Sequence, residues 1–189
     1  MTLTLKERIE NYRKQFPRYT HELGVSWRIY GIWQIGNYYR RRHGYYGEYP
    51  PSYLKRVYAL FPDKNRILHL FSGTVKGRGV TFDINPDLNP DVVGDVREIR
   101  KYFSDGQFDL IIADPPYERK DFERYGYKPF SKQRVVRDLW YITEKGGFLV
   151  WLDVIVPIYS KEQWSLRGNI LLLTGTNRRV RVVTIWERV

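Results

Sequence analysis

Residues 110–119 read LIIADPPYER, and this stretch decides how the rest of the sequence is interpreted. Its first four residues form an apolar run, which is typical of a strand buried on both faces of a sheet. The run stops at the carboxylate of Asp114 and at two prolines, Pro115 and Pro116, which have no N–H group to donate to a neighbouring strand. We therefore expect a buried strand whose carboxyl end carries Asp114 and Tyr117.

Similar short apolar runs follow one another through the last two thirds of the chain and predict strands. These runs cover residues 67–71, 79–84, 91–95, 108–114, 148–153, 170–175 and 180–187. Helical patterns lie between some of them, at 96–103 and 131–144. This order predicts an α/β fold with a mostly parallel seven-stranded sheet. Since only TNRR separates the last two runs, we expect them to form an antiparallel hairpin that closes the sheet.

The first 48 residues are predicted to form a helical, basic and aromatic extension of the domain at 49–189. Apolar side chains recur at helical spacing in residues 5–16, so a helix is expected there, ending before Pro17. A second helix is expected from Thr20 to about Arg42, with Trp27, Tyr30 and Trp33 on a face packed against the core. A third helix is expected to begin at Ser52, the predicted N-cap of SYLKRVYALF.

Composition limits the classes of protein that fit. The chain has 189 residues, of which 42% are hydrophobic, enough to bury a core. It has no cysteine and three histidines, so a thiolate or histidine metal site is not expected. The N-terminus carries charges where a signal peptide would be apolar, and no apolar run is long enough to span a membrane. We expect a cytoplasmic protein without membrane partners. The sequence does not indicate an oligomeric state.

The formal net charge is +11, and the excess is concentrated near the N-terminus. Residues 1–60 contain eleven Lys and Arg but only four Asp and Glu. Basic segments favour polyanions, because neutralising phosphates releases counterions. Nucleic acid is therefore the expected partner, although a basic surface that serves only solubility has the same composition.

Acids or a glycine turn follow four successive predicted strands. The first strand ends in Phe71, Ser72, Gly73 and Thr74, and the next three end in Asp83, Asp95 and Asp114. Taken singly, Asp83 or Asp95 could be a helix cap. Ligands of open α/β sheets bind at the carboxyl ends of the strands, so four such ends together predict a binding site.

From about Tyr49 to its C-terminus the chain resembles class I methyltransferases that use S-adenosylmethionine, specifically those that methylate amino groups of nucleic-acid bases. The resemblance lies in LFSGT at 70–74, TFDINP at 81–86, GDVREI at 94–99 and ADPPY at 113–117. It implies a Rossmann-like fold and S-adenosyl-L-methionine as the cofactor.

The resemblance also implies roles for individual residues. The backbone of Phe71, Ser72, Gly73 and Thr74 would approach the methionine part of the cofactor, and Asp83 would bind the ribose hydroxyls. Asp95 and the backbone of Val96 would contact the adenine ring, with Ile84 as an apolar neighbour. YPPSYLKR, which includes Tyr49 and Pro50, is similar to a family motif that also touches the cofactor.

One feature departs from the family. Only nine residues separate Gly73 from Asp83, where the usual fold has a full helix. We expect that helix to be short or missing. Helix N-termini usually supply amide donors to ligands, so here the amides would come from Thr74, Lys76, Gly77 and Gly79 instead.

The chemistry of amino methylation gives a reason for Asp114, Pro115, Pro116 and Tyr117. The lone pair of an exocyclic amine is delocalised into the base, and hydrogen-bond acceptors that draw its N–H groups out of the ring plane raise its reactivity. Asp114 offers a carboxylate acceptor and Pro115 a carbonyl, whose direction is fixed by the two locked φ angles. Tyr117 offers a ring on which an extruded base can stack. Pro-Pro could instead simply end a strand, or belong to a peptide ligand in extended conformation.

Basic residues near aromatic ones are candidates for nucleic-acid contacts. Arg40, Arg41 and Arg42 form the first group. Tyr117 ends the ADPPY motif and begins a segment, with Arg119 and Lys120, that could close over a substrate. Arg178 lies in the predicted hairpin, where Arg179 and Arg181 could extend a basic rim.

Together with these residues, the resemblance implies an enzyme that methylates adenine N6 in DNA. The same chemistry on RNA or on cytosine N4 is an alternative. A second class also fits the residues, namely a non-catalytic nucleic-acid-binding domain with a degenerate cofactor pocket.

Overall fold

The structure is a computed structural model that describes residues 2–36, 49–124, 128–175 and 180–189. Its strands are β1 (Leu23–Val25), β2 (Ile29–Ile35), β3 (Ile67–Leu70), β4 (Val80–Asp83), β5 (Val92–Val93), β6 (Phe108–Ala113), β7 (Thr143–Asp153), β8 (Trp164–Thr174) and β9 (Val180–Arg188). Its α-helices are α1 (Leu5–Gln15), α2 (Tyr53–Leu60), α3 (Arg119–Arg124) and α4 (Lys132–Ile142). Short 3₁₀ helices are η1 (Pro17–Tyr19), η2 (Pro86–Leu88) and η3 (Val96–Lys101).

In the described residues, all strands belong to one nine-stranded sheet with the order β1-β2-β8-β9-β7-β6-β3-β4-β5. β9 is antiparallel to both β7 and β8, and β1 is antiparallel to β2, whereas every other pair is parallel. The predicted seven-stranded, mostly parallel sheet with its antiparallel end is confirmed. β1 and β2 extend it beyond β8.

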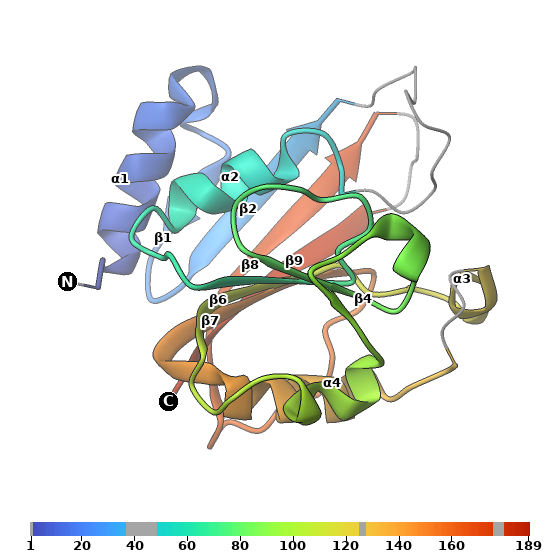
Figure 1. Ribbon diagram of the computed structural model, residues 1–189. Helices are drawn as coiled ribbons and strands as arrows, with labels where there is room; N and C mark the ends of the chain where they lie inside the picture. The colour runs from blue at the N-terminus through green and yellow to red at the C-terminus, as the bar shows by residue number, and fades with distance from the viewer. Residues whose placement is uncertain (1, 37–48, 125–127, 176–179) are drawn as a thin grey trace.

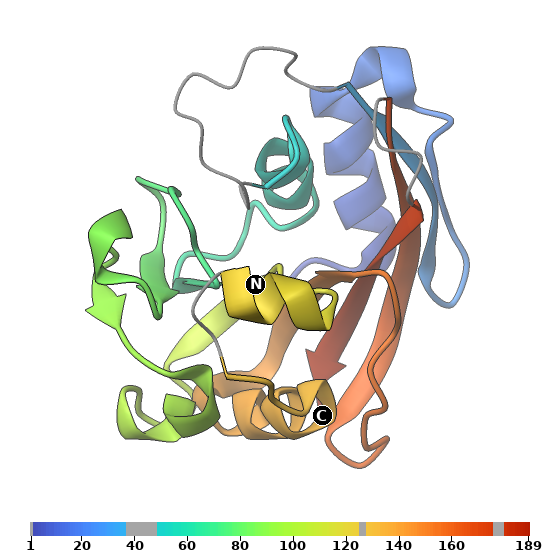
Figure 2. The ribbon, with the colours of Figure 1, turned by 90° about the vertical axis from the view of Figure 1, so that its right-hand side faces the viewer.

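Helices cover both faces of the sheet, as Figure 1 shows, with α1 and α2 on one side and α4 on the other. Each face has its own hydrophobic cluster. One packs α1 and α2 against the sheet, including β2, and the other packs η3 and α4 against the opposite face. Figure 1 shows α3 at the side of the sheet, and this side faces the viewer in Figure 2. Phe122 of α3 is buried in the same cluster as η3 and α4. The result is a Rossmann-like α/β fold, as predicted.

The helix predicted from Thr20 to Arg42 is wrong for its described part. Residues 23–35 form β1 and β2, and β2 pairs in parallel with β8 along its whole length. Burial along β2 alternates: Ile29, Trp33 and Ile35 are buried, whereas Tyr30, Ile32 and Gln34 are exposed. Backbone pairing with the open edge of β8 therefore makes this segment a strand, although its aromatic residues have the three-residue spacing of a helix. Trp33 does pack in the core, but from a strand, and Trp27 is 66% exposed.

Gly31 gives a test of this strand. Its φ is +152°, and a Cβ at this position would lie 2.0 Å from the backbone oxygen of Glu22. An alanine here would have an unfavourable φ angle and a clash with the Glu22 oxygen, so we expect Gly31→Ala to destabilise the protein by about 2 kcal/mol or more. Thermal unfolding checks this, with Gly36→Ala as the control, because a Cβ there meets nothing within 4 Å. Equal melting temperatures for the two variants would contradict the β1–β2 pairing.

Two other local predictions need correction. The helical segment predicted over 96–103 is shorter, a 3₁₀ helix over residues 96–101 with a kink at Glu98. Ser52 begins α2 with a left-handed φ of 60° and makes no side-chain capping bond. By contrast α1 begins at a Thr4 capping box, and α4 begins where Ser131 accepts from the amide of Arg134.

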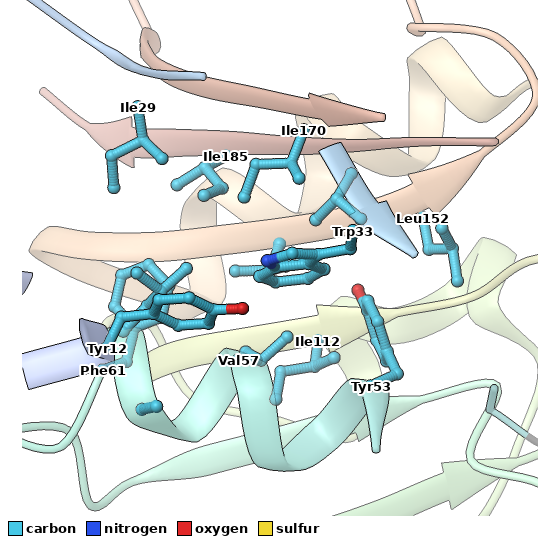
Figure 3. Packing of buried hydrophobic residues seen from close by; sticks show 14 of the residues in the cluster. Tyr12, Ile29, Trp33, Tyr53, Val57, Phe61, Ile112, Leu152, Ile170 and Ile185 are labelled. Carbon is cyan, nitrogen blue, oxygen red and sulfur yellow. The ribbon is translucent and has the colours of Figure 1, made fainter. Parts of the chain in front are cut away.

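The N-terminal part is held to α2 by a buried polar cluster. Arg56 on α2 donates to Glu22 and to the hydroxyl of Tyr12, and that hydroxyl donates to Glu22 over 2.6 Å. Figure 3 shows Tyr12 and Trp33 packed between α2 and the sheet. The described part of the extension thus shares a core with the rest of the chain, and the boundary at residue 48 stays a prediction.

None of the helices in the described ranges has both the length and the apolar character needed to cross a membrane.

Candidate active site

The carboxyl ends of β3, β4, β6 and β7 meet at one edge of the sheet. Leu70 of β3 is paired with Ala113 of β6, and Ala113 is paired with Trp151 of β7. Phe71 and Asp114 follow these paired positions, so they leave neighbouring strands side by side. The expectation that the strand ends form one site is consistent with this register.

The turn after β3 is tight and makes internal hydrogen bonds. Phe71 has φ 58° and Gly73 has φ 55°, both in the left-handed region. The amide of Ser72 donates to the carbonyl of Phe82 over 3.1 Å, whereas the buried Ser72 Oγ has no hydrogen-bond partner. Residues 71–79 contain no helix, so the helix predicted to be short or missing is missing. Thr74, the last residue of the motif, is exposed.

Asp83 at the end of β4 is buried and fastens this turn. Its Oδ2 accepts from the amide of Gly73 over 2.9 Å, and its Oδ1 accepts from the amide of Asn85 over 3.0 Å. Ile84 is half-buried against the cluster below α4 and η3. The structure thus brings together Gly73, predicted to approach the methionine part of the cofactor, and Asp83, predicted to bind its ribose.

Asp95 lies next along the same edge and is engaged by its own neighbour. Its Oδ1 accepts from the amide of Arg97 over 2.9 Å, and both carboxylate oxygens accept from the Arg97 guanidinium. These bonds hold the pKa of Asp95 below its usual range. Val96 is buried. Asp95 is therefore the N-cap of η3. A helix cap was the alternative to a cofactor contact for this residue.

Tyr49 ties the segment before α2 to the end of β6. Its hydroxyl donates to the carbonyl of Ile112 over 3.2 Å, and its ring stacks on Tyr53 at 5.4 Å between centroids. Pro50 is buried and accepts from the amide of Tyr53. The YPPSYLKR segment therefore contacts β6 at Ile112, two positions before Asp114 in the sequence.

Asp114 has an unusual electrostatic setting. The Tyr117 hydroxyl donates to its Oδ1, while Pro115 and Pro116 between them are buried. Burial raises the pKa of Asp114 to about 7, although the Tyr117 hydroxyl and the cation of Arg181 oppose that rise. Burial also raises the pKa of Tyr117 well above its usual value. Asp114 can therefore gain or lose a proton near neutral pH.

Three charged residues that the sequence did not single out as catalytic surround this carboxylate. Arg181, at the start of β9, reaches Thr174 over 3.3 Å and acts electrostatically on Asp114 and Tyr117. Asp153 ends β7, and Lys132 begins α4; they form an ion pair of 2.7 Å. The run FLVWLD ends in an acid like the other strands, so the same signal could have identified Asp153.

The predicted nucleic-acid contacts are only partly described. Arg40, Arg41, Arg42 and Arg178 lie outside the described residues. Arg119 and Lys120 are exposed on α3, where they pair with Glu123 over 3.7 Å and with Glu118 over 3.0 Å. Arg181, expected on a basic rim, is instead half-buried beside Asp114 and Tyr117.

The raised pKa of Asp114 predicts how stability depends on pH. Because the folded pKa is about 7 and the ordinary value is 3.8, the folded state binds the extra proton between these limits. The free energy of unfolding should therefore fall as the pH rises from about 4 to 7. Asp114→Asn removes this penalty, and its stability advantage over the wild type should reach on the order of 2–4 kcal/mol at pH 8.

Chemical denaturation of both proteins at pH 4 and pH 8 measures this difference. Most of the advantage should be present at pH 8 and little of it near pH 4. An advantage that does not grow with pH would contradict a buried, protonatable Asp114.

Several solved structures are similar to part of this chain. TrmN from Thermus thermophilus is 15% identical over 66% of this chain and 44% of its own, with a TM-score of 0.46. The putative methyltransferase yhhF from Escherichia coli is 12% identical over 84% and 98% of the two chains, with a TM-score of 0.47. SMU.1697c, a putative methyltransferase from Streptococcus mutans in complex with SAH, is 14% identical over 67% and 88%, with a TM-score of 0.42.

No protein-family model matches this sequence, and neither does any curated protein. The chain spans less than half the length of TrmN. With identities of 15% or less and TM-scores below 0.5, these similarities carry no conclusion about function, and the functional assignment rests on the site itself.

Proposed function

We propose that this protein transfers a methyl group from S-adenosylmethionine to an exocyclic amino group of a nucleic-acid base. Adenine N6 in DNA is the first substrate to test. One observation carries the proposal: the Asp114–Tyr117 segment leaves β6 beside the turn at Phe71–Thr74, because Ala113 and Leu70 are paired in register. A carboxylate for the amine and a turn for the cofactor would then share one edge.

The residues around the turn fit the cofactor in most respects. Ser72 Oγ, buried without a hydrogen-bond partner, would gain one from the methionine part of the cofactor. The ribose hydroxyls would donate to Asp83, which the amides of Gly73 and Asn85 hold in place. The adenine contact predicted for Asp95 would have to share that carboxylate with Arg97. When bound, the cofactor supplies a sulfonium methyl group.

Asp114 would act on the substrate amine. In the structure the Tyr117 hydroxyl donates to its Oδ1, and in the complex an N–H of the base would take this position. As the amine nitrogen gains the methyl group it becomes positively charged, so an N–H proton must leave. A carboxylate with a pKa of about 7 can accept that proton near neutral pH. Tyr117, once released, would present its ring to the extruded base.

Positioning of the two reactants would supply the rest of the rate enhancement. The segment between Asp114 and Tyr117 consists of two buried prolines with fixed φ angles, so it has little freedom to lose when substrate binds. Holding the amine and the methyl donor in line removes much of the entropic cost of their encounter.

A second candidate is a nucleic-acid-binding domain without catalysis. The observation that favours it is the engagement of Asp95 by Arg97, together with the missing helix between β3 and β4. Both would weaken cofactor binding. Methylation of RNA, or of cytosine N4, keeps the proposed site and changes only the substrate.

Incubation with cofactor carrying a labelled methyl group separates these functions. The wild type is offered duplex DNA, single-stranded DNA and RNA in separate reactions, and each polymer is then digested to nucleosides. We expect label in N6-methyladenine from DNA. Label in RNA or in N4-methylcytosine would assign RNA or cytosine as the substrate instead. Binding of a polymer without any label in it would support a binding domain without catalysis.

A further inference from the structure

Lys132 and Asp153 form the most buried ion pair close to Asp114 among the described residues. Their side chains are 12% and 0% exposed, and Lys132 Nζ lies 2.7 Å from Asp153 Oδ2. Asp153 also accepts from Trp151 Nε1 over 3.2 Å and from the amide of Val154 over 2.7 Å. The carboxylate of Asp153 is thus fixed at the end of β7, one strand away from Asp114.

The same lysine reaches the predicted catalytic segment. Lys132 Nζ donates to the carbonyl of Tyr117 over 3.4 Å, and it lies 6.0 Å from the centroid of the Tyr117 ring. One ammonium group therefore links the N-terminus of α4, the end of β7 and the residue that donates to Asp114.

We propose that Lys132 and Asp153 are a positioning pair, which fixes the backbone of Tyr117 and sets the charge around Asp114 during methyl transfer. This inference rests on the proposed function. Lys132 would hold the Tyr117 carbonyl while the Tyr117 side chain moves between Asp114 and the base. Asp153 would hold Lys132 in the geometry that allows this.

The burial of the pair supports a role at the site. Removing two charges from water is costly, and apolar residues of similar size often give equal or greater stability. Stability alone therefore gives little reason for an ion pair here. Its place between two strand ends, in contact with Tyr117, gives it a function in positioning.

The charges that face Asp114 come from several elements. Arg181 lies on β9, Asp153 on β7 and Lys132 on α4, while Tyr117 follows β6. The phenols of Tyr49 and Tyr53 also interact with its charge. Because Lys132 and Asp153 act on Asp114 with opposite signs, removing one or the other should change its protonation in opposite directions.

Two single variants test the inference. Lys132→Met removes a cation and leaves Asp153 unpaired, so the titration midpoint of Asp114 should rise by about 0.5 or more. Asp153→Asn removes an anion and leaves Lys132 charged, so the midpoint should fall by a similar amount. NMR of the Asp114 carboxyl carbon measures both midpoints in the free protein, and the acidic limb of the pH–rate profile should move the same way.

Steady-state kinetics provides the second readout. We expect kcat to fall about tenfold or more in both variants, with KM for the polymer within about twofold, because positioning rather than binding is lost. Lys132→Arg should recover part of kcat, since it keeps a donor and a positive charge. Lys161→Met, an exposed lysine on the loop after β7, is the control and should change neither readout.

Midpoints that move in the same direction, or do not move, would overturn the inference, as would an unchanged kcat in both variants. If a single variant does not fold, the neutral double variant Lys132→Met with Asp153→Asn replaces it. The double variant should fold, keep a midpoint near that of the wild type and still lose kcat. If the wild type methylates no polymer, the proposed function fails, and the NMR midpoints alone decide whether the pair acts on Asp114.

Discussion

Replacing Asp114 by asparagine is expected to lower methyl transfer at pH 8 by at least about 100-fold. Asparagine has nearly the same size but no negative charge, so it cannot stabilise the positive charge that develops on the amine or accept its proton. Binding of the cofactor should remain within a few-fold of the wild type, because the predicted cofactor contacts lie on the turn after β3 and on Asp83. The variant should also be more stable than the wild type at this pH, since burial of the ionised carboxylate disfavours the folded state.

Single-turnover transfer of the labelled methyl group measures the first effect, and calorimetric titration with the cofactor measures the second. Asp105→Asn is the matched control, because Asp105 is exposed in the turn before β6 and should leave activity unchanged. A variant with full activity would contradict the role of Asp114. Loss of both activity and cofactor binding would instead indicate that Asp114 belongs to the cofactor site.

Removal of Arg56 should produce the largest loss of stability. The side chains of Arg56 and Glu22 are 4% and 6% exposed, and the Tyr12 hydroxyl bonds to both. Arg56→Met leaves the Glu22 carboxylate buried without its cation, so we expect a cost of about 3–5 kcal/mol. Because this cluster joins α1 and the start of β1 to α2, the variant should also expose the N-terminal residues to protease.

Denaturant unfolding with limited proteolysis measures these effects. Lys55→Met is the matched control, since Lys55 is the exposed neighbour on the same helix. The double variant Arg56→Met with Glu22→Gln should recover much of the loss, because no unpaired charge remains. Equal unfolding of Arg56→Met and Lys55→Met would show that the cluster does not hold the N-terminal part.

Local signals in the sequence were enough to predict the central sheet and to predict which strand ends meet at one edge. The buried strands are continuous apolar runs, and their ends are marked by residues that cannot continue a strand, such as Pro115 after Asp114. Parallel connection of such strands brings their carboxyl ends to one edge whatever the details of packing. The turn at Phe71–Thr74, Asp83 and Asp114 could therefore be placed together from the sequence, and so could the absence of a helix before β4.

Contacts that form only in the folded protein determined the rest. Residues 23–35 have aromatic spacing suited to a helix, but the edge of β8 offers unpaired backbone groups, and pairing with them makes β2 a strand. Asp95 looked like Asp83 in the sequence, yet Arg97 two residues away engages it. Lys132, Asp153 and Arg181 are separated from Asp114 by 18 to 67 residues, and their shared charge environment exists only because α4, β7 and β9 meet at the end of β6.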